Sequence, residues 1–297
     1  MSTVQNTKDI PSSVKFLFGG LSGCMATCIV QPIDLIKTRM QLSQKGEFKN
    51  SFDAFTKIYK QEGVVNMYKG LSAGLFRQAT YTTTRLGVFN VLQDYYTKVD
   101  PNTGKVTPPD FMKKLLIGSV AGGVGSIVGT PAEVSLIRMT SDGRLPVAER
   151  RNYKNVFDAL LRISKDEGVL NMWRGCTPTV ARAVVLNAAQ LSVYSQAKEM
   201  LVKTGYFVDG TSTHLTASLI SGFISTAVSI PIDMSKTRIQ TMKNNEYKNA
   251  LDVIQKVARN EGVFALWKGF TPYFLRLGPH TVFTFLFLEK MNELYLK

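Results

Sequence analysis

Three arginines occupy the same place in three similar stretches of this chain. Arg77, Arg182 and Arg276 each follow by seven residues the last glycine of a nine-residue motif. A planar guanidinium binds a carboxylate through two parallel hydrogen bonds and keeps its charge in a desolvated site. Three converging arginines would suit a small ligand with at least two negative charges. One arginine alone is explained equally well by a structural ion pair, so the shared register is what favours binding.

The three stretches differ one and two helical turns beyond these arginines. Tyr81, Leu186 and His280 come first, and Arg85, Gln190 and Thr284 follow. Because these positions break the symmetry, they are where a keto group and a hydroxyl group can be distinguished. For His280, a proton-coupling role and a structural role are equally supported. The candidate ligand-binding residues are Arg77, Tyr81, Arg85, Arg182, Asn187, Gln190, Arg276 and His280.

A motif of proline and charged residues precedes each stretch. It reads PIDLIK at 32–37, PAEVSL at 131–136 and PIDMSK at 231–236. Proline removes a backbone hydrogen bond and kinks a helix, while an acid and a base three residues apart lie on nearly one face. Three kinked helices that meet at an axis would join acid to base between neighbours and close a path. The expected kinks are Pro32, Pro131 and Pro231.

Both motifs recur about every hundred residues. The three prolines lie 99 and 100 residues apart, and the second motif is EGVVNMYKG at 62–70, EGVLNMWRG at 167–175 and EGVFALWKG at 261–269. A fixed period indicates one body of three similar units. We expect a polar tail at 1–13 and repeats at 14–100, 109–204 and 212–297.

Each repeat predicts two long helices with a short one between them. The first helices begin near Val14, Met112 and His214, and before their prolines they are nearly free of charge. About 20 such residues cross a bilayer. The second helices, at 72–95, 177–201 and 271–295, carry arginines. A central arginine costs ~2.5–3.5 kcal/mol in a membrane helix, so these side chains should face a wet interior.

The short helices are predicted at the surface of the membrane. FKNSFDAF at 48–55, YKNVFDAL at 153–160 and YKNALDVI at 247–254 place apolar residues at helical spacing after a polar start. Lysines and arginines gather in the same loops. The positive-inside bias therefore places the three loops in one compartment and both termini in the other.

Composition narrows the class of partner. The chain has 297 residues, is 44% hydrophobic and carries a formal charge of +14, which implies nucleic acid, an anionic membrane surface or a small acidic solute. No reading helix or zinc finger supports nucleic acid. The three cysteines match neither a disulfide framework nor a metal site. No catalytic triad, metal spacing or phosphate-binding loop indicates an enzyme.

The paired motifs, in three copies, resemble those of the mitochondrial carrier family over nearly the whole chain. The resemblance implies an all-α membrane protein of six transmembrane helices that form a pseudo-threefold barrel, with amphipathic helices on the matrix side. It further implies the mitochondrial inner membrane, both termini toward the intermembrane space, and exchange of solutes by alternating access.

Four longer stretches resemble members of this family that exchange 2-oxoglutarate for malate, which implies these dicarboxylates as substrates. The alternatives are a dicarboxylate/phosphate exchanger, a proton-leak carrier and, in another class, a soluble basic binding module. The stretches are GLSAGLFRQATYTTTRLG at 70–87, GTPAEVSLIRMTSDGRLPVAERRNYKNVFDAL at 129–160, ARAVVLNAAQ at 181–190 and KGFTPYFLRLGPHTV at 268–282.

The resemblance also assigns two gates. On the matrix side it pairs Glu133 with Lys236 and Asp233 with Lys37. Asp34 lacks its usual partner because Leu136 stands at that position. On the cytoplasmic side, Lys198 and Glu289 are the one full ion pair that the family pattern allows, so that gate should be weak.

A lipid is the remaining expected partner, and no other cofactor is expected. Free amides at a helix start favour anions, and an aromatic–basic pair suits a headgroup region. The family resemblance suggests cardiolipin, and simple anchoring at the membrane surface explains each site alone nearly as well. The expected lipid-binding residues are Lys69, Gly70, Arg174, Gly175, Lys268 and Gly269.

Overall fold

Six long and three short α-helices make up most of the described structure. The computed structural model describes residues 11–44, 46–99, 106–107, 110–204, 210–242 and 246–296. The long helices are α1 (Ser12–Leu42), α3 (Leu71–Tyr96), α4 (Phe111–Ser141), α6 (Cys176–Lys203), α7 (Thr211–Thr241) and α9 (Phe270–Leu296). The short helices are α2 (Ser51–Asn66), α5 (Val156–Asp166) and α8 (Ala250–Asn260).

The expected all-helical architecture is found, with one small addition outside the helices. In the connector between α3 and α4, strand β1 (Lys98–Val99) pairs antiparallel with β2 (Val106–Thr107). Two residues per strand are too few to leave an alternating pattern in the sequence. Short 3-10 helices complete the described elements, at Asp142–Arg144, Val147–Glu149, Val169–Trp173 and Val263–Trp267.

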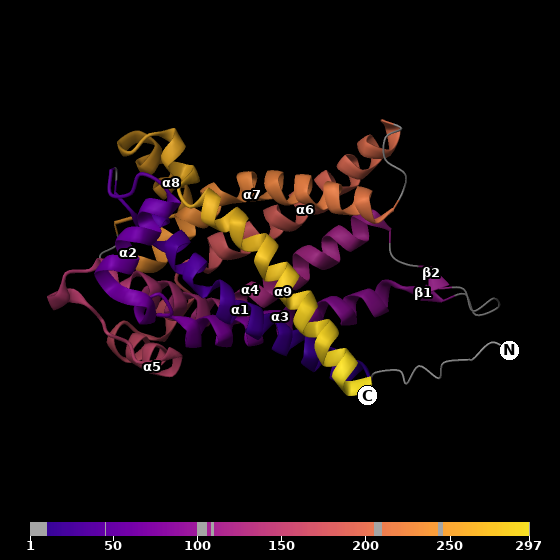
Figure 1. Cartoon of the computed structure of the whole chain (residues 1–297), viewed down its shortest axis with the longest axis horizontal. Helices are drawn as coiled ribbons and strands as arrows, with labels where there is room; N and C mark the ends of the chain where they lie inside the picture. The colour runs from indigo at the N-terminus through magenta and orange to yellow at the C-terminus, as the bar shows by residue number, and fades with distance from the viewer. Residues whose placement is uncertain are drawn as a thin grey trace.

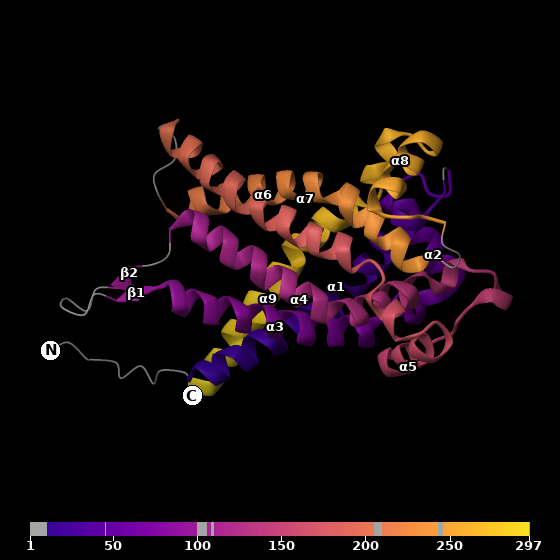
Figure 2. The same cartoon turned by 180° about the vertical axis from the view of Figure 1, so that it is seen from behind.

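The six long helices form a closed ring. Each packs against the next long helix along the chain, and α1 packs against α9. At one end of the ring lie α2, α5 and α8, whereas the start of α1, the end of α9 and the β1–β2 pair lie at the other (Figures 1 and 2). Helices α1, α4 and α7 also contact one another, so the ring narrows among them.

The first helix of every repeat continues past its proline. Pro32, Pro131 and Pro231 lie inside α1, α4 and α7, and each helix ends ten residues later, at Leu42, Ser141 and Thr241. A proline inside a helix removes one backbone hydrogen bond and bends the axis. The three helix ends that follow the prolines therefore stand at equivalent places around the ring.

The polarity of the ring is reversed relative to a water-soluble bundle. Leu17, Leu21 and Met25 follow one another at four-residue spacing on α1 and are 56%, 45% and 43% exposed. Ser22 and Gln31 on the same helix are buried. Within the residues that the structure describes, three stretches are long and apolar enough to cross a membrane: Leu17–Leu42, Met112–Arg144 and Thr216–Thr241. An apolar outside and a polar inside suit a lipid environment.

The short helices begin with the same reciprocal cap in all three repeats. In α2, the side chain of Asn50 accepts a hydrogen bond from the Asp53 amide, and the Asp53 carboxylate accepts one from the Lys49 amide. Asn155 with Asp158 and Asn249 with Asp252 repeat this arrangement. The hydrogen bond from Lys49, aided by the Lys57 side chain, lowers the pKa of Asp53. This capping box explains the repeated Lys-Asn-x-x-Asp pattern.

Candidate functional site

A polar cavity of about 340 Å³ lies inside the ring. Four of the predicted ligand-binding residues line it, and two of the predicted gate residues, Glu133 and Lys236, form part of the same wall. The candidate binding residues and part of the candidate gate therefore line one continuous cavity. The predicted ligand-binding residues that line the cavity are Arg77, Tyr81, Arg85 and Arg182, joined by Gln78, Thr82 and Leu186.

The other four predicted ligand-binding residues lie outside this lining. Asn187 accepts a hydrogen bond from Arg85 at 3.4 Å and donates one to the Gly118 carbonyl, so it positions Arg85 against α4. The backbone carbonyl of Gln190 accepts a hydrogen bond from the Ser221 hydroxyl. Within the described structure, the buried Nε2 atom of His280 has no hydrogen-bond partner. The fourth residue, Arg276, belongs to the gate.

Two of the three symmetric arginines pair with acids of the proline motifs. Arg276 Nε lies 2.9 Å from Asp34 Oδ1, and Arg182 Nε lies 2.8 Å from Asp233 Oδ1. Arg182 also donates a hydrogen bond to the Tyr273 hydroxyl at 2.9 Å. The sequence left open whether these arginines contact a ligand or form structural ion pairs. In this structure the guanidinium groups of Arg182 and Arg276 form ion pairs.

The gate contains both ion pairs that the family pattern implies. Lys37 pairs with Asp233, and Lys236 Nζ lies 2.5 Å from Glu133 Oε1. Asp34 lacks the base that Leu136 replaces, as expected, yet it is not left unpaired, because Arg276 reaches it from α9. A long arginine side chain on a neighbouring helix fills the place of the missing base.

A second layer of ion pairs was missed by the sequence reasoning. Arg39 pairs with Glu62 at 2.9 Å, Arg138 pairs with Glu167, and Arg238 pairs with Glu261 at 2.6 Å. Each arginine lies two residues after the gate-base position, and each glutamate opens the EG motif. These pairs tie α1, α4 and α7 to the last part of α2 and to the residues that directly follow α5 and α8. The threefold recurrence of the arginine was the signal that could have revealed them.

For two glutamates of this layer, Glu167 and Glu261, the arginine partners favour the charged form. Burial alone would raise the pKa of Glu167, but the hydrogen bonds and charge of Arg138 outweigh it and leave the pKa lowered. In the same way, burial of Glu261 is outweighed by Arg238 and Lys268, so its pKa is lowered too. A carboxylate that keeps its charge while partly buried holds its arginine partner firmly.

A glutamine adds two hydrogen bonds between helices beside the gate ion pairs. Gln41 of α1 donates a hydrogen bond to the carboxylate of Asp233 and accepts one from the Thr237 hydroxyl, both at 2.9 Å. It thereby links α1 to α7 beside the Lys37–Asp233 pair. Arg39 Nε in turn donates to the Thr140 carbonyl at the end of α4. These bonds close the ring at the α2, α5 and α8 end.

The two residues of the expected cytoplasmic gate lie toward the opposite end of the ring, on α6 and α9. Among the described side chains, no ion pair joins Lys198 to Glu289, the two residues of the expected weak gate. Glu289 is exposed on α9. Nearby on α6 and α7, the Tyr194 hydroxyl lies 2.6 Å from Nδ1 of His214. The weakness of this gate remains a prediction.

The expected lipid-binding motif has a packing role in the structure. Gly70, Gly175 and Gly269 adopt φ values of 87°, 77° and 86°, a left-handed conformation that strains other residues. A side chain at Gly175 would lie 2.8 Å from Cγ of Gln240. The bases beside them turn toward the neighbouring repeat: Lys268 donates to the Ser43 carbonyl and Arg174 to the Met242 carbonyl.

Comparison with known proteins agrees with this arrangement. A family model described as "Mitochondrial carrier protein" matches residues 8–100, 107–205 and 208–297. The human mitochondrial 2-oxoglutarate/malate carrier protein is 60% identical over 293 residues, covering 96% of this chain and 92% of the relative. Its counterpart from Caenorhabditis elegans is 57% identical over 299 residues, covering 98% and 96%.

A plant relative is more distant but aligns over a similar length. The mitochondrial dicarboxylate/tricarboxylate transporter of Arabidopsis thaliana is 44% identical over 283 residues, covering 94% of this chain and 92% of the relative. Three matches to one family model, in register with the three pairs of long helices and their shared proline and glycine motifs, establish that this chain belongs to the mitochondrial carrier family.

Proposed function

We propose that this chain exchanges 2-oxoglutarate for malate, or for a related dicarboxylate, across the mitochondrial inner membrane. The observation that carries the proposal is the arginine-lined cavity, whose wall includes Glu133 and Lys236 of the gate. The chain that forms it is 60% identical to the human 2-oxoglutarate/malate carrier. Arg77, Arg85 and Arg182 all line a space of about 340 Å³, which suits a small dianion.

In this proposal all six long helices cross the membrane. The apolar outer faces of α1, α4 and α7 meet lipid, and α3, α6 and α9 complete the ring that separates lipid from the polar cavity. The bases around α2, α5 and α8 favour the matrix side for that end. Both termini then face the intermembrane space.

The ion pairs suggest how binding is coupled to opening. A dicarboxylate in the cavity would compete with Asp233 for Arg182, which lines the cavity, and with Asp34 for Arg276 once that side chain turns inward. Each arginine that moves to the substrate leaves a gate acid with less positive charge, which weakens the closed state. The gate would then open toward the matrix only with a dicarboxylate present, as exchange requires.

Exchange by purified protein in liposomes tests the proposal. Uptake of radiolabelled 2-oxoglutarate should be fast into malate-loaded vesicles and slow into phosphate-loaded or empty vesicles. Equal uptake against phosphate would favour a dicarboxylate/phosphate exchanger. Proton flux without any counter-solute would favour a proton-leak carrier, and either result would overturn the proposed exchange.

We further propose that cardiolipin binds between repeats 3 and 1. A cavity of about 620 Å³ lies there, with the starts of α2 and α9 on its rim, and with Ile33, Phe55 and Leu275 in its apolar wall. Because the Lys268 side chain is held by Glu261 and Ser43, the amides of Gly269 and Phe270 are the expected phosphate ligands. Cardiolipin should raise the unfolding temperature of delipidated protein, and phosphatidylcholine should not. Equal effects would contradict a specific site.

A further inference from the structure

Repeat 2 departs from the other two repeats twice within one stretch. Leu136 replaces the gate base, and 36 residues separate Pro131 from Glu167, whereas 30 separate the equivalent residues in repeats 1 and 3. The six added residues fall between α4 and α5. Both departures therefore affect the contact that repeat 2 makes with repeat 1.

The added segment has a defined shape. The Asp142 carboxylate accepts hydrogen bonds from the amides of Arg151 and Asn152, at 2.7 and 2.9 Å. The Arg150 guanidinium donates to the carbonyls of Leu145 and Gly143. The segment thus forms a compact loop closed by its own hydrogen bonds, and it holds Arg144 in a fixed position.

Arg144 reaches across to repeat 1. Its Nη2 and Nε atoms lie 2.8 and 3.3 Å from the two carboxylate oxygens of Glu47, a bidentate pair. Glu47 is itself positioned, since its carboxylate accepts the Gln44 amide and its carbonyl accepts the Lys57 ammonium group. The side chains are 21% and 32% exposed, so water reaches the pair.

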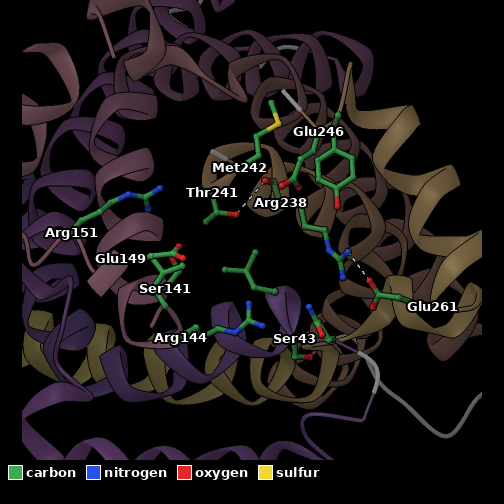
Figure 3. A pocket seen from close by; sticks show the side chains of 14 residues that line it. Ser43, Ser141, Arg144, Glu149, Arg151, Arg238, Thr241, Met242, Glu246 and Glu261 are labelled. Atoms are coloured by element: carbon green, nitrogen blue, oxygen red, sulfur yellow. Dashed lines mark hydrogen bonds and ion pairs between the residues drawn. The ribbon is translucent and has the colours of Figure 1, made fainter. Parts of the chain in front are cut away.

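Arg144 lines a hollow at the α2, α5 and α8 end of the ring, where α1, α4 and α7 end. This hollow has a volume of about 590 Å³, and Arg151 lines it as well. Figure 3 shows both side chains reaching into it, with Arg238 and Glu261 across from them. The ends of α1, α4 and α7 also line this hollow. In addition, Gly143 packs so closely on the Arg39–Glu62 pair that any side chain there would overlap both groups. The added loop therefore docks on α1 and α2 together.

We propose that Arg144 and Glu47 form an outer gate that replaces, between repeats 1 and 2, the ion pair that Leu136 removes. The proposal rests on the exchange function proposed above, because the pair must break when α1 and α4 separate toward the matrix. Its partial exposure makes it a weak latch that opens together with the buried pairs Lys37–Asp233 and Lys236–Glu133. Arg144 and Glu47 are positioning residues that do not contact the substrate.

A charge-swap cycle with a cysteine reporter tests this gate. Ser141, buried at the end of α4 beside the hollow, is changed to cysteine in a chain whose Cys24, Cys28 and Cys176 are serine. Maleimide labelling is then followed in detergent micelles. Arg144→Glu or Glu47→Arg should each speed labelling about two- to fivefold, the range for a half-exposed ion pair, and the double variant should restore the slow rate.

The control is Lys203→Glu, which makes the same change in charge as Arg144→Glu but at the other end of the ring, where Lys203 pairs with Glu199 on its own helix. It should leave labelling unchanged. Single variants that label like the parent, or a double variant that labels as fast as the singles, would overturn the outer gate. Labelling needs no solute, so absent 2-oxoglutarate/malate exchange would count against the proposed function alone.

Discussion

The guanidinium of Arg276 lies 2.9 Å from the carboxylate of Asp34, where the symmetry of the repeats would place a gate base on α4. Leu136 occupies that α4 position, so a residue expected in the substrate site supplies the missing charge. In the proposed exchange, one side chain is thereby shared between holding the gate and binding the substrate. The asymmetry of repeat 2 would then make the gate directly sensitive to occupancy of the cavity.

Restoring the base should separate the two roles. In a Leu136→Lys variant, Asp34 gains its own partner and Arg276 is released to the cavity. We expect the KM for 2-oxoglutarate to fall about threefold to tenfold, as for one additional hydrogen bond of ordinary strength. The maximal exchange rate should fall as well, because a complete ring of three bridges is harder to open. Initial rates in malate-loaded liposomes measure both constants.

Leu136→Met is the control, since it keeps the size of the side chain without adding a charge. It should leave both constants near their wild-type values. An unchanged KM in Leu136→Lys, with Leu136→Met equally silent, would show that Asp34 does not compete with the substrate for Arg276.

The two gates should differ in their tolerance of neutralisation. Lys236 is 2% exposed, and its removal would leave Glu133 buried without its base. Breaking a buried pair in this way costs ~3–5 kcal/mol, so Lys236→Ala should lower the exchange rate by more than tenfold. Glu289→Gln removes an exposed charge and should change exchange by less than twofold. Equal losses in the same uptake assay would refute the claim that the matrix-side gate dominates.

The repeats made the ion pairs between two proline motifs predictable. They did not make predictable the ion pairs between a proline motif and a residue of the candidate binding site. Lys37 with Asp233 and Lys236 with Glu133 follow from three equivalent helices around one axis. The pair between Arg276 and Asp34 depends on how far a flexible side chain reaches between helices. The spacing of residues along the sequence does not determine that reach. Arg144 with Glu47 depends on a loop, and loop conformation is set by local hydrogen bonds rather than by periodicity.

The glycine that ends each EG motif should be intolerant of a side chain. At Gly175, alanine would face both a left-handed backbone and a clash with Gln240, so we expect Gly175→Ala to cost at least ~1–2 kcal/mol. For a chain of this size that corresponds to a drop in unfolding temperature of about 2–8 °C. Differential scanning fluorimetry in detergent measures it.

Gly278 provides the matched comparison, because it lies inside α9 with no atom within 4 Å of an added Cβ. Gly278→Ala should hold or raise the unfolding temperature, since alanine favours a helix by ~1 kcal/mol. A fall as large as that of Gly175→Ala would show that the left-handed turn is not the cause.

Acid should loosen the second layer of ion pairs at the α2, α5 and α8 end. The pKa values of Glu167 and Glu261 are lowered from the ordinary 4.5 by their basic partners, so the folded state binds fewer protons than the unfolded state. Their contribution to stability is therefore fully present above pH 4.5 and is lost as the pH falls through the lowered values. Unfolding temperatures should be nearly flat from neutral pH to about pH 5 and fall below it.

Removing one of these carboxylates should reduce the fall of the unfolding temperature at acidic pH. Glu167→Gln abolishes the titrating group and leaves Arg138, which is fully buried, with a neutral partner. The variant should unfold at a lower temperature at pH 7 and lose less on acidification than the parent, while Glu289→Gln should follow the parent throughout. A proton changes the stability of the fold only through a group whose proton affinity differs between the folded and unfolded states. Parallel curves of unfolding temperature against pH for Glu167→Gln and the parent would therefore mean that other groups control the acid response.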